Sequence, residues 1–409
     1  MKRKVWIISQ TLFCYMLLTL FFTLSPMAAT VEELEKRVMD LENVQKPAEK
    51  KSDLKPKLFG YIETWYQKDD SDLAAGKVDN EFRVRRARID VKGNVTDAVG
   101  YRVTANLDGA ASTRAQLWDG YITYKLHPLA LVTVGQFKYN FTLEGLEGTP
   151  DRIPVLRAES INDIATPLGT KGGSLRDVGV QLSGGRKDVL GLKYGVALIN
   201  GAGLNTRDNN NDKDVVGRVT ISPLNGFTLG VSGYQGKGET EDAAIDVDET
   251  AYGAHAELIL KDMGLSFRGE YVKAKWKNWG YTTTTTYAPS CSSTACTPKA
   301  TTTTGWKALN GTDQEPNGLY LQAAYKLPPL PDLQVMARYE DYEKDSNTPN
   351  SHLKTTTLGA TYYIKDKTRI TANYLMRDAE DSPIVTAQET SATGDKIGNL
   401  ILVQMLVAY

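Results

Sequence analysis

The chain has 409 residues, of which 41% are hydrophobic and 24% are charged, and its formal net charge is −1 at pH 7. This nearly neutral balance, with no basic patch interleaved with aromatic residues, argues against a nucleic-acid partner. Length alone allows one large barrel or roughly two or three ordinary domains.

The N-terminus has the three parts of a secretory signal. Lys2, Arg3 and Lys4 precede an apolar run over residues 5–24, and small residues follow up to Ala29. This order predicts a signal peptide over residues 1–29 and export of the mature chain. An uncleaved anchor is the alternative, because the apolar run nears the length of a spanning helix.

A short helical pattern follows the signal. Val31, Leu34, Val38 and Leu41 recur at alternating steps of three and four, which predicts a periplasmic coiled-coil helix over residues 30–46. About two heptads are marginal for a helix on its own, so a frayed surface helix remains the alternative. The Lys-rich residues 47–57 are expected to form a linker.

From residue 58 to the end, the period changes to two. Val99, Tyr101 and Val103 alternate with Arg102 and Thr104, so one face of the segment is apolar and the other is polar. The same alternation recurs in five more groups: Val178, Val180, Leu182; Leu192, Tyr194, Val196, Leu198; Leu319, Leu321, Ala323, Tyr325; Leu333, Val335, Ala337, Tyr339; and Ile370, Ala372, Tyr374, Met376. Residues 58–409 are therefore predicted to form strands with one apolar face.

The connections between these segments alternate between short and long. Residues 94–98 and 186–189 are short links, whereas residues 140–174 and 277–317 are long ones. Short turns at one end and long loops at the other are typical of outer-membrane barrels. We expect an all-β, transmembrane antiparallel β-barrel of about sixteen strands; a soluble sandwich has no reason to sort its loops in this way.

The C-terminus agrees with a location in the outer membrane of a Gram-negative bacterium. Ile401, Val403, Met405 and Val407 form an apolar face that ends at Tyr409, similar to the terminal signal read by the β-barrel assembly machinery. The chain has 21 tyrosines against 9 phenylalanines, as expected for rings placed at the lipid headgroups.

Basic residues concentrate on the faces predicted to line the lumen. In residues 81–93, Phe82 and Val84 have one parity and Ala87 and Ile89 the other, which predicts a β-bulge near Arg85 and Arg86. The predicted pore-lining, anion-binding residues are Arg83, Arg85, Arg86, Arg88, Arg102, Lys138, Arg218, Arg268 and Arg338.

The overall charge makes this basic lumen informative. Removing residues 1–29 removes three basic residues and no acid, which leaves 45 basic and 49 acidic residues and a net charge of −4. Acids are therefore expected in the loops, and cationic walls raise the local concentration of anions. The alternative is that the lumen charges pair with one another and only keep the wall hydrated.

The long segment 140–174 carries more apolar residues than a loop tip bathed in water needs. We expect it to fold back into the barrel and narrow it, with Arg152, Arg157 and Lys171 as constriction cations. An external lid or a partner contact is the alternative.

Other chemistries have little support in the sequence. Cys291 and Cys296 are predicted to form a disulfide in an exposed loop, since neither a CxxC spacing nor histidine partners indicate a metal site. Only His127, His255 and His352 occur, and none accompanies a nucleophile motif. No enzyme activity, no metal and no cofactor are therefore expected.

Three stretches resemble the phosphate-selective porin O and P family: FRVRRARIDVKG over residues 82–93, LWDGYITYKL over residues 117–126 and VGQFKYNFTLEGL over residues 134–146. The resemblance implies homotrimers of sixteen-stranded barrels in which arginine and lysine residues guide anions. It places Arg85 and Arg86 in the pore lining and Lys138 at the start of the inward loop.

The predicted function is passive diffusion of small anionic solutes, with phosphate among the candidates, through a basic lumen of a barrel embedded in outer-membrane lipid. Two alternatives remain open at this point. One is a general, non-specific porin, and the other is a barrel that acts mainly as an adhesin or a structural anchor.

Overall fold

The computed structural model describes residues 55–71, 80–107, 115–165, 175–208, 210–238, 247–292, 295–308, 311–380 and 397–409, with the backbone alone over residues 280–308. The chain divides into two units after residue 52, and all described residues belong to the second unit. The predicted signal peptide 1–29, the coiled-coil helix 30–46 and most of the linker 47–57 lie outside the described residues. None of the helices in the described part is long and apolar enough to cross a membrane.

The described residues form eighteen strands and two short helical segments, the π-helix η1 and the 3₁₀-helix η2. In chain order the elements are β1 (Lys57–Asp69), β2 (Asn80–Asn94), β3 (Val99–Asn106), β4 (Gln116–His127), β5 (Ala130–Lys138), η1 (Ile161–Ala165), β6 (Arg176–Arg186), β7 (Leu192–Ile199), β8 (Asp214–Leu224), β9 (Phe227–Gly238), β10 (Val247–Leu260), η2 (Lys261–Met263), β11 (Leu265–Trp276), β12 (Trp279–Ser292), β13 (Ala295–Ala308), β14 (Asn317–Lys326), β15 (Leu333–Glu343), β16 (His352–Lys365), β17 (Thr368–Ala379) and β18 (Leu400–Ala408).

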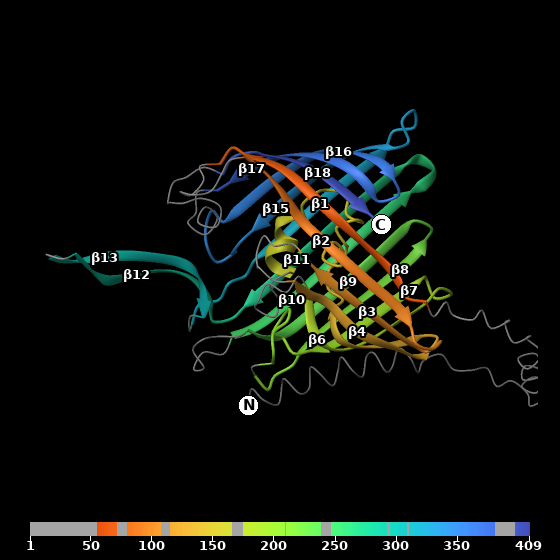
Figure 1. Ribbon diagram of the computed structural model, residues 1–409, viewed down its shortest axis with the longest axis horizontal. Helices are drawn as coiled ribbons and strands as arrows, with labels where there is room; N and C mark the ends of the chain where they lie inside the picture. Colours follow the sequence, from red (N-terminus) through yellow and green to blue (C-terminus); the bar gives the residue numbers. More distant parts are fainter. Residues whose placement is uncertain are drawn as a thin grey trace, which may run out of the picture. The chain divides into compact units, whose positions relative to one another are not determined.

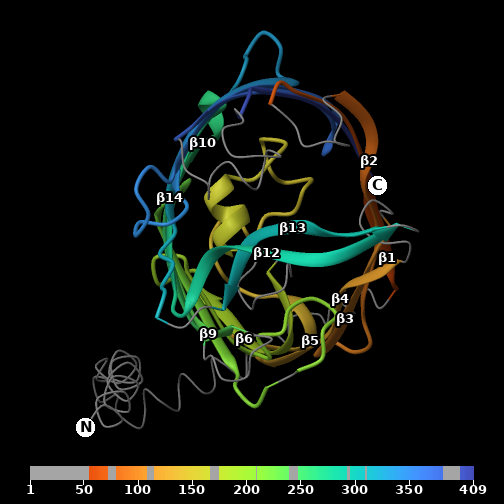
Figure 2. The same ribbon diagram turned by 90° about the vertical axis from the view of Figure 1, so that its left-hand side faces the viewer.

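Sixteen of these strands, β1–β11 and β14–β18, close into one antiparallel barrel (Figures 1 and 2). The first strand closes against the last, with Tyr61 opposite Ala408 and Asp69 opposite Leu400. Strand β11 pairs directly with β14, and β12 and β13 form a separate two-stranded sheet. The predicted all-β barrel of about sixteen strands is confirmed.

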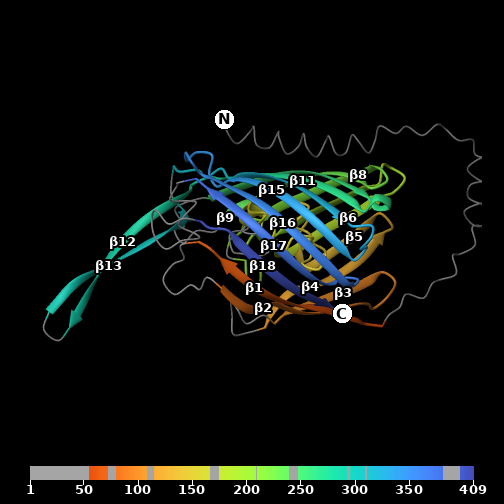
Figure 3. The same ribbon diagram turned by 90° about the horizontal axis from the view of Figure 1, so that it is seen from above.

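The turn lengths follow the predicted alternation. Links of a few residues join β2 to β3, β4 to β5, β6 to β7, β8 to β9, β10 to β11, β14 to β15 and β16 to β17, and longer segments make the other connections between neighbouring barrel strands. Figure 3 shows the strands running obliquely across the barrel from one set of links to the other. The longest predicted loop, residues 277–317, contains the β12–β13 hairpin. The sequence of this hairpin is rich in threonine and shows no apolar alternation, so its two strands were not predicted.

Successive side chains alternate between an apolar outer face and a polar inner face. Val231 is 59% exposed and Leu321 is 55% exposed, whereas their neighbours Ser232 and Gln322 are buried. A soluble protein rarely leaves so many apolar side chains exposed in one continuous surface. An apolar belt around a closed sheet is the pattern of barrels that span the outer membrane.

The segment after β5 folds into the barrel, as Figure 2 shows for the yellow trace inside the ring of strands. We call residues 139–165 the inner loop. Its side chains Phe141, Ile161 and Ile164 are fully buried in a cluster that includes Val272 and Tyr320 of the wall. This burial confirms, for the described residues, that the segment after β5 folds inward.

The outer and inner faces of a strand meet different surroundings, so a charged substitution should affect stability differently on each face. In β6, Val180 faces outward and Ser183 faces inward. Val180→Arg should destabilise the folded barrel in lipid by about 2–4 kcal/mol, since an outward charge meets hydrocarbon, whereas Ser183→Arg meets water in the lumen. Urea titration of folding into lipid vesicles measures the difference, and equal losses for the two variants would contradict the assignment of faces.

Candidate functional site: the lumen and its inner loop

A β-bulge in the second strand places several arginines on the lumen side. Glu63 lies opposite Arg86 and Thr64 lies opposite Val84, so Arg85 is the extra residue between them. The predicted bulge is therefore confirmed. Because a bulge changes the parity of a strand, side chains on both sides of Arg85 reach the lumen although the sequence alternation is broken.

The cations on β2 and β3, together with Arg176 at the start of β6, lie next to aromatic rings and carboxylates of β1–β4. Arg83 and Arg85 each lie 5.2 Å from the centre of the Trp65 ring. Arg86 pairs with Glu63 at 2.7 Å, and Arg102 pairs with Asp90 at 2.5 Å. We call this part of the lumen the basic wall, and define it by Arg83, Arg85, Arg86, Arg88, Arg102 and Arg176.

The inner loop is anchored to β15 by a buried ion-pair group. Arg338 Nη1 lies 3.0 Å from Glu144 of the inner loop, and its Nη2 lies 2.5 Å from Glu340. The N–H of Glu159 donates a hydrogen bond to Glu340 at 2.8 Å. All three charged side chains at the centre of this group are almost fully buried, so they hold the inner loop and are not available to a solute.

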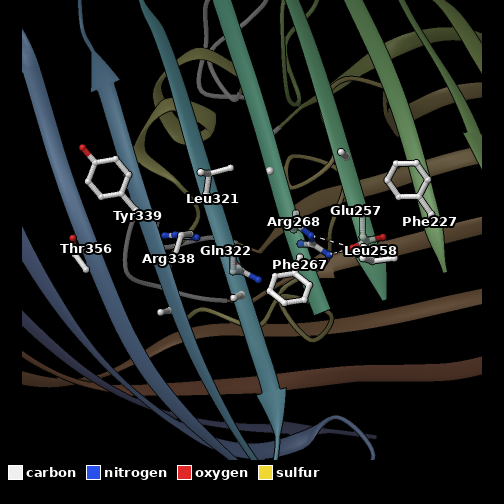
Figure 4. Close-up of a pocket in the computed structure, with 14 residues that line it drawn as sticks. Phe227, Glu257, Leu258, Phe267, Arg268, Leu321, Gln322, Arg338, Tyr339 and Thr356 are labelled. Atoms are coloured by element: carbon white, nitrogen blue, oxygen red, sulfur yellow. Dashed lines mark hydrogen bonds and ion pairs between the residues drawn. The ribbon is translucent and has the colours of Figure 1, made fainter. Parts of the chain in front are cut away.

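A second anchor lies on β11. The backbone N–H groups of Leu143 and Glu144 both donate to the Glu270 carboxylate. Arg268 pairs with Glu147 of the inner loop at 2.7 Å and with Glu257 of β10 at 2.5 Å. The Arg268–Glu257 contact is drawn with dashed lines in Figure 4. The hollow in that view is lined by outward-facing side chains of the apolar belt, such as Phe267, Leu321 and Tyr339. This hollow is therefore a poor candidate for an anion site.

A third anchor, on β17, holds the part of the inner loop that crosses the barrel. Arg369 donates to three backbone carbonyls, those of Thr149 at 3.2 Å, Pro150 at 2.7 Å and Arg152 at 2.6 Å. Asn373 accepts the N–H of Val155 at 2.7 Å. Together with the anchors on β11 and β15, these contacts fix the inner loop as part of the lumen wall.

Two wall glycines make room for the inner loop. A Cβ at Gly195 would lie 1.8 Å from the amide nitrogen of Asn140, and a Cβ at Gly318 would lie 2.4 Å from the Cβ of Ser160. At Gly318 a larger residue would push the inner loop away, because the Cβ of Ser160 cannot move without its backbone. At Gly195 the Asn140 amide would have to turn aside. The positions of these glycines could not be interpreted before the path of the loop was known.

The cations of the inner loop are largely bound by the loop itself. Arg152 is 2% exposed and donates to the carbonyls of Pro154 and Val155. Arg157 and Lys138 both donate to the carbonyl of Glu147, at 3.3 Å and 3.1 Å. Burial, together with the nearby charge of Arg152, lowers the pKa of Arg157 to about 9, so Arg157 still carries its charge at neutral pH.

Three of the five carboxylates of the inner loop pair with cations on β11, β15 and the segment after β15. Glu144 pairs with Arg338, Glu147 with Arg268, and Asp163 lies 3.9 Å from Lys344. The cations of the inner loop, in contrast, lie within electrostatic range of the basic wall: Arg86 and Arg176 both act on Arg157. The inner loop therefore adds positive charge to the side of the lumen that is already basic.

The residues predicted to line the pore lie in different parts of the lumen. Arg83, Arg85, Arg86, Arg88 and Arg102 gather on the basic wall, and Lys138, Arg152 and Arg157 lie at or in the inner loop. Arg218 is separate on β8, with Nη2 3.0 Å from Nε2 of His255. Arg268 and Arg338, which were predicted as pore-lining, anion-binding residues, are each held by two carboxylates and anchor the inner loop.

Two further predictions concern residues whose side chains the structure does not describe. Lys171 lies outside the described residues. The backbone register of the β12–β13 hairpin places Cys291 opposite Cys296, and their side chains are not described. The predicted disulfide therefore stays a prediction.

Sequence reasoning missed Trp65, Trp118 and Arg176 as parts of this site. A second register shift lies between β3 and β4, where Thr104 faces Asp119 and Ala105 faces Leu117, so Trp118 is an extra residue. Arg176 pairs with Asp119 at 2.8 Å and lies 4.9 Å from the centre of the Trp118 ring. The available signal was the change of apolar parity between Leu117 and Ile122, which also indicates a bulge.

Comparison with known proteins identifies the family. The family model described as phosphate-selective porin O and P matches residues 61–408. The anion-selective porin from Comamonas acidovorans has a similar fold, with a TM-score of 0.62 and 13% identity over 87% of this chain and 99% of that one. A comparison with curated protein sequences found no match.

Two other solved structures are similar at the level of the fold. OmpT of Vibrio cholerae in its trimer form has a TM-score of 0.55 and 12% identity, over 87% of this chain and 99% of that one. OmpF of Salmonella typhi, in complex with daunomycin, has a TM-score of 0.58 and 12% identity, over 87% and 97% of the two chains.

The β15 anchor can be tested by removing its cation. Arg338→Met leaves the buried carboxylates of Glu144 and Glu340 without their guanidinium, which should destabilise the docked inner loop by about 3–5 kcal/mol. We expect a larger or noisier single-channel conductance in planar bilayers and faster proteolysis within residues 139–165.

The matched control is Arg186→Met, which removes an exposed pair with Asp188. It should change neither readout. Parent-like conductance and proteolysis for Arg338→Met would show that the inner loop does not depend on this anchor.

Proposed function

The chain belongs to the phosphate-selective porin O and P family and is an outer-membrane porin, and from this premise we propose that it is a passive diffusion channel that prefers small anions. The main observation behind the proposal is where the inner loop places its acidic and basic side chains. Glu144 and Glu147 of the inner loop pair with Arg338 and Arg268, while Arg157 lies within electrostatic range of Arg86 and Arg176 of the basic wall. A small anion would pass beside cations from both the wall and the loop.

A modest number of such charges is enough for selectivity. One unit charge at 4 Å from another contributes about 1 kcal/mol in water, and more where the wall excludes water. Two cations beside the path would therefore favour an anion over a cation by about tenfold or more. Screening by salt lowers this preference, so we expect it to be strongest at low ionic strength.

The pairing of the wall cations argues against a very high selectivity. Glu63, Glu81, Asp90 and Asp119 each pair with one arginine of the basic wall. This observation supports the second candidate function, a general porin with a weak preference for anions. The anion-selective porin of Comamonas acidovorans, which shares the fold, supports the first candidate. Neither observation favours phosphate over other anions.

The assembly is part of the same proposal. The trimer form of OmpT, which shares the fold, supports a homotrimer for this chain. We infer that residues 1–29 are removed as a signal peptide, and that the helix 30–46 with its linker 47–57 assists oligomerisation in the periplasm. Outer-membrane lipid would cover the apolar belt, and the apolar, aromatic C-terminal strand would be read by the β-barrel assembly machinery. An adhesin or anchor function would need no such sorting of lumen charge, and no catalytic step is proposed.

The decisive measurement is the reversal potential in a planar bilayer under a KCl gradient. We expect an anion-selective potential for the parent protein. In Arg85→Gln with Arg88→Gln, the ratio of chloride to potassium permeability should fall by about tenfold, since two lumen charges are lost. Arg86 is left in place because Glu63, which it neutralises, is fully buried.

The control for this experiment is Lys261→Gln, which removes an exposed cation from the short η2 segment. Its reversal potential should equal that of the parent. A cation-selective or closed parent channel would overturn the proposed function, and an unchanged ratio in the double variant would overturn the role of the basic wall.

A further inference from the structure

The basic wall contains two tryptophans that each hold two arginines. The guanidinium carbons of Arg83 and Arg85 both lie 5.2 Å from the centre of the Trp65 ring. Those of Arg88 and Arg176 lie 4.1 Å and 4.9 Å from the centre of the Trp118 ring. We propose that Trp65 and Trp118 are positioning residues for anion passage, each of which holds two like-charged groups together beside the path. The proposal rests on the proposed function.

Each of the two tryptophans lies at a β-bulge. Trp65 lies across from the bulge at Arg85, in the β1–β2 pair. Trp118 is itself the extra residue of the bulge in the β3–β4 pair. In each pair, the bulge gives the lumen one more side chain than a regular strand would, and that side chain completes a group of one indole and two arginines.

The Trp65 ring is fixed by a hydrogen bond and by packing against buried side chains. Its Nε1–H donates to Glu63 at 2.7 Å, and the ring packs in a buried cluster with Val155 of the inner loop and Leu402 of β18. Only 4% of Trp65 is exposed, so a solute in the lumen cannot reach the ring itself. Any effect of Trp65 on a passing anion must therefore act through Arg83 and Arg85.

Two guanidinium groups placed close together repel each other and would turn apart on flexible side chains. The face of an indole carries a partial negative charge, and it attracts both groups toward the same ring. Guanidinium is flat and weakly hydrated, so it can stack on the ring and still donate from the N–H groups at its edge. Part of that donation is to carboxylates, since Arg83 pairs with Glu81 at 3.1 Å and Arg176 pairs with Asp119 at 2.8 Å. Each tryptophan would in this way keep two guanidinium groups together beside the path of the anion.

The test replaces the ring faces and leaves every arginine in place. In planar bilayers under a KCl gradient, Trp65→Leu and Trp118→Leu should each lower the ratio of chloride to potassium permeability, by about two- to fivefold. Trp65→Phe and Trp118→Phe retain an aromatic face and should keep most of the parent ratio. A merely structural role would alter conductance and stability without this difference between leucine and phenylalanine.

A third tryptophan supplies the matched control. Trp276 is partly buried against the inner core, and no cation–π contact to its ring occurs among the described residues. Trp276→Leu should leave the permeability ratio unchanged. Should a leucine variant fail to fold, as judged by its migration on unheated gels, Trp65→Met and Trp118→Met fill more volume without a ring face and should show the same loss of selectivity.

The outcomes separate this inference from the proposed function. A parent channel without anion preference overturns both. An anion-selective parent whose leucine and methionine variants keep the parent ratio leaves the proposed function intact and overturns the positioning role. Equal losses in the phenylalanine and leucine variants would also overturn it, because the aromatic face would then not be what matters.

Discussion

The constraint on which this structure depends is that a backbone within hydrocarbon must satisfy all of its own hydrogen bonds. A sheet meets this requirement only when it closes, and here β1 and β18 pair along nine residues to remove the last edge. Closure fixes which face of each strand looks inward. It therefore decides which charges meet the lumen, and the inner loop and the basic wall both follow from it.

This constraint explains why so much of the fold could be predicted from the sequence. Lipid on one face and water on the other impose a period of two, and strands that obey it, such as β17 with Ile370 and Tyr374 outward, were recognised from their alternation. Even the bulge at Arg85 was visible, because it interrupts a pattern that is otherwise strict. The β12–β13 hairpin lies outside the barrel sheet, where that rule does not apply, and its strands were missed.

The candidate site was predicted less completely, for a physical reason. Alternation shows that Arg338 faces inward, but it does not show what the side chain meets there. Its partner Glu144 is 194 residues away in sequence, on a loop whose path is decided by packing of Phe141 and Ile161 against the wall. The tryptophans were overlooked for the same reason, since an inward ring becomes informative only once the arginines beside it are known.

The distribution of charge reconciles a basic lumen with a chain that has more acids than bases. A carboxylate in the lumen reduces anion preference only where its charge is not offset, and Glu147 and Glu144 of the inner loop are paired with Arg268 and Arg338. The same ion pairs that hold the inner loop in the lumen thus also offset part of its negative charge. Mechanical anchoring and electrostatic selectivity are, in this barrel, two results of one set of contacts.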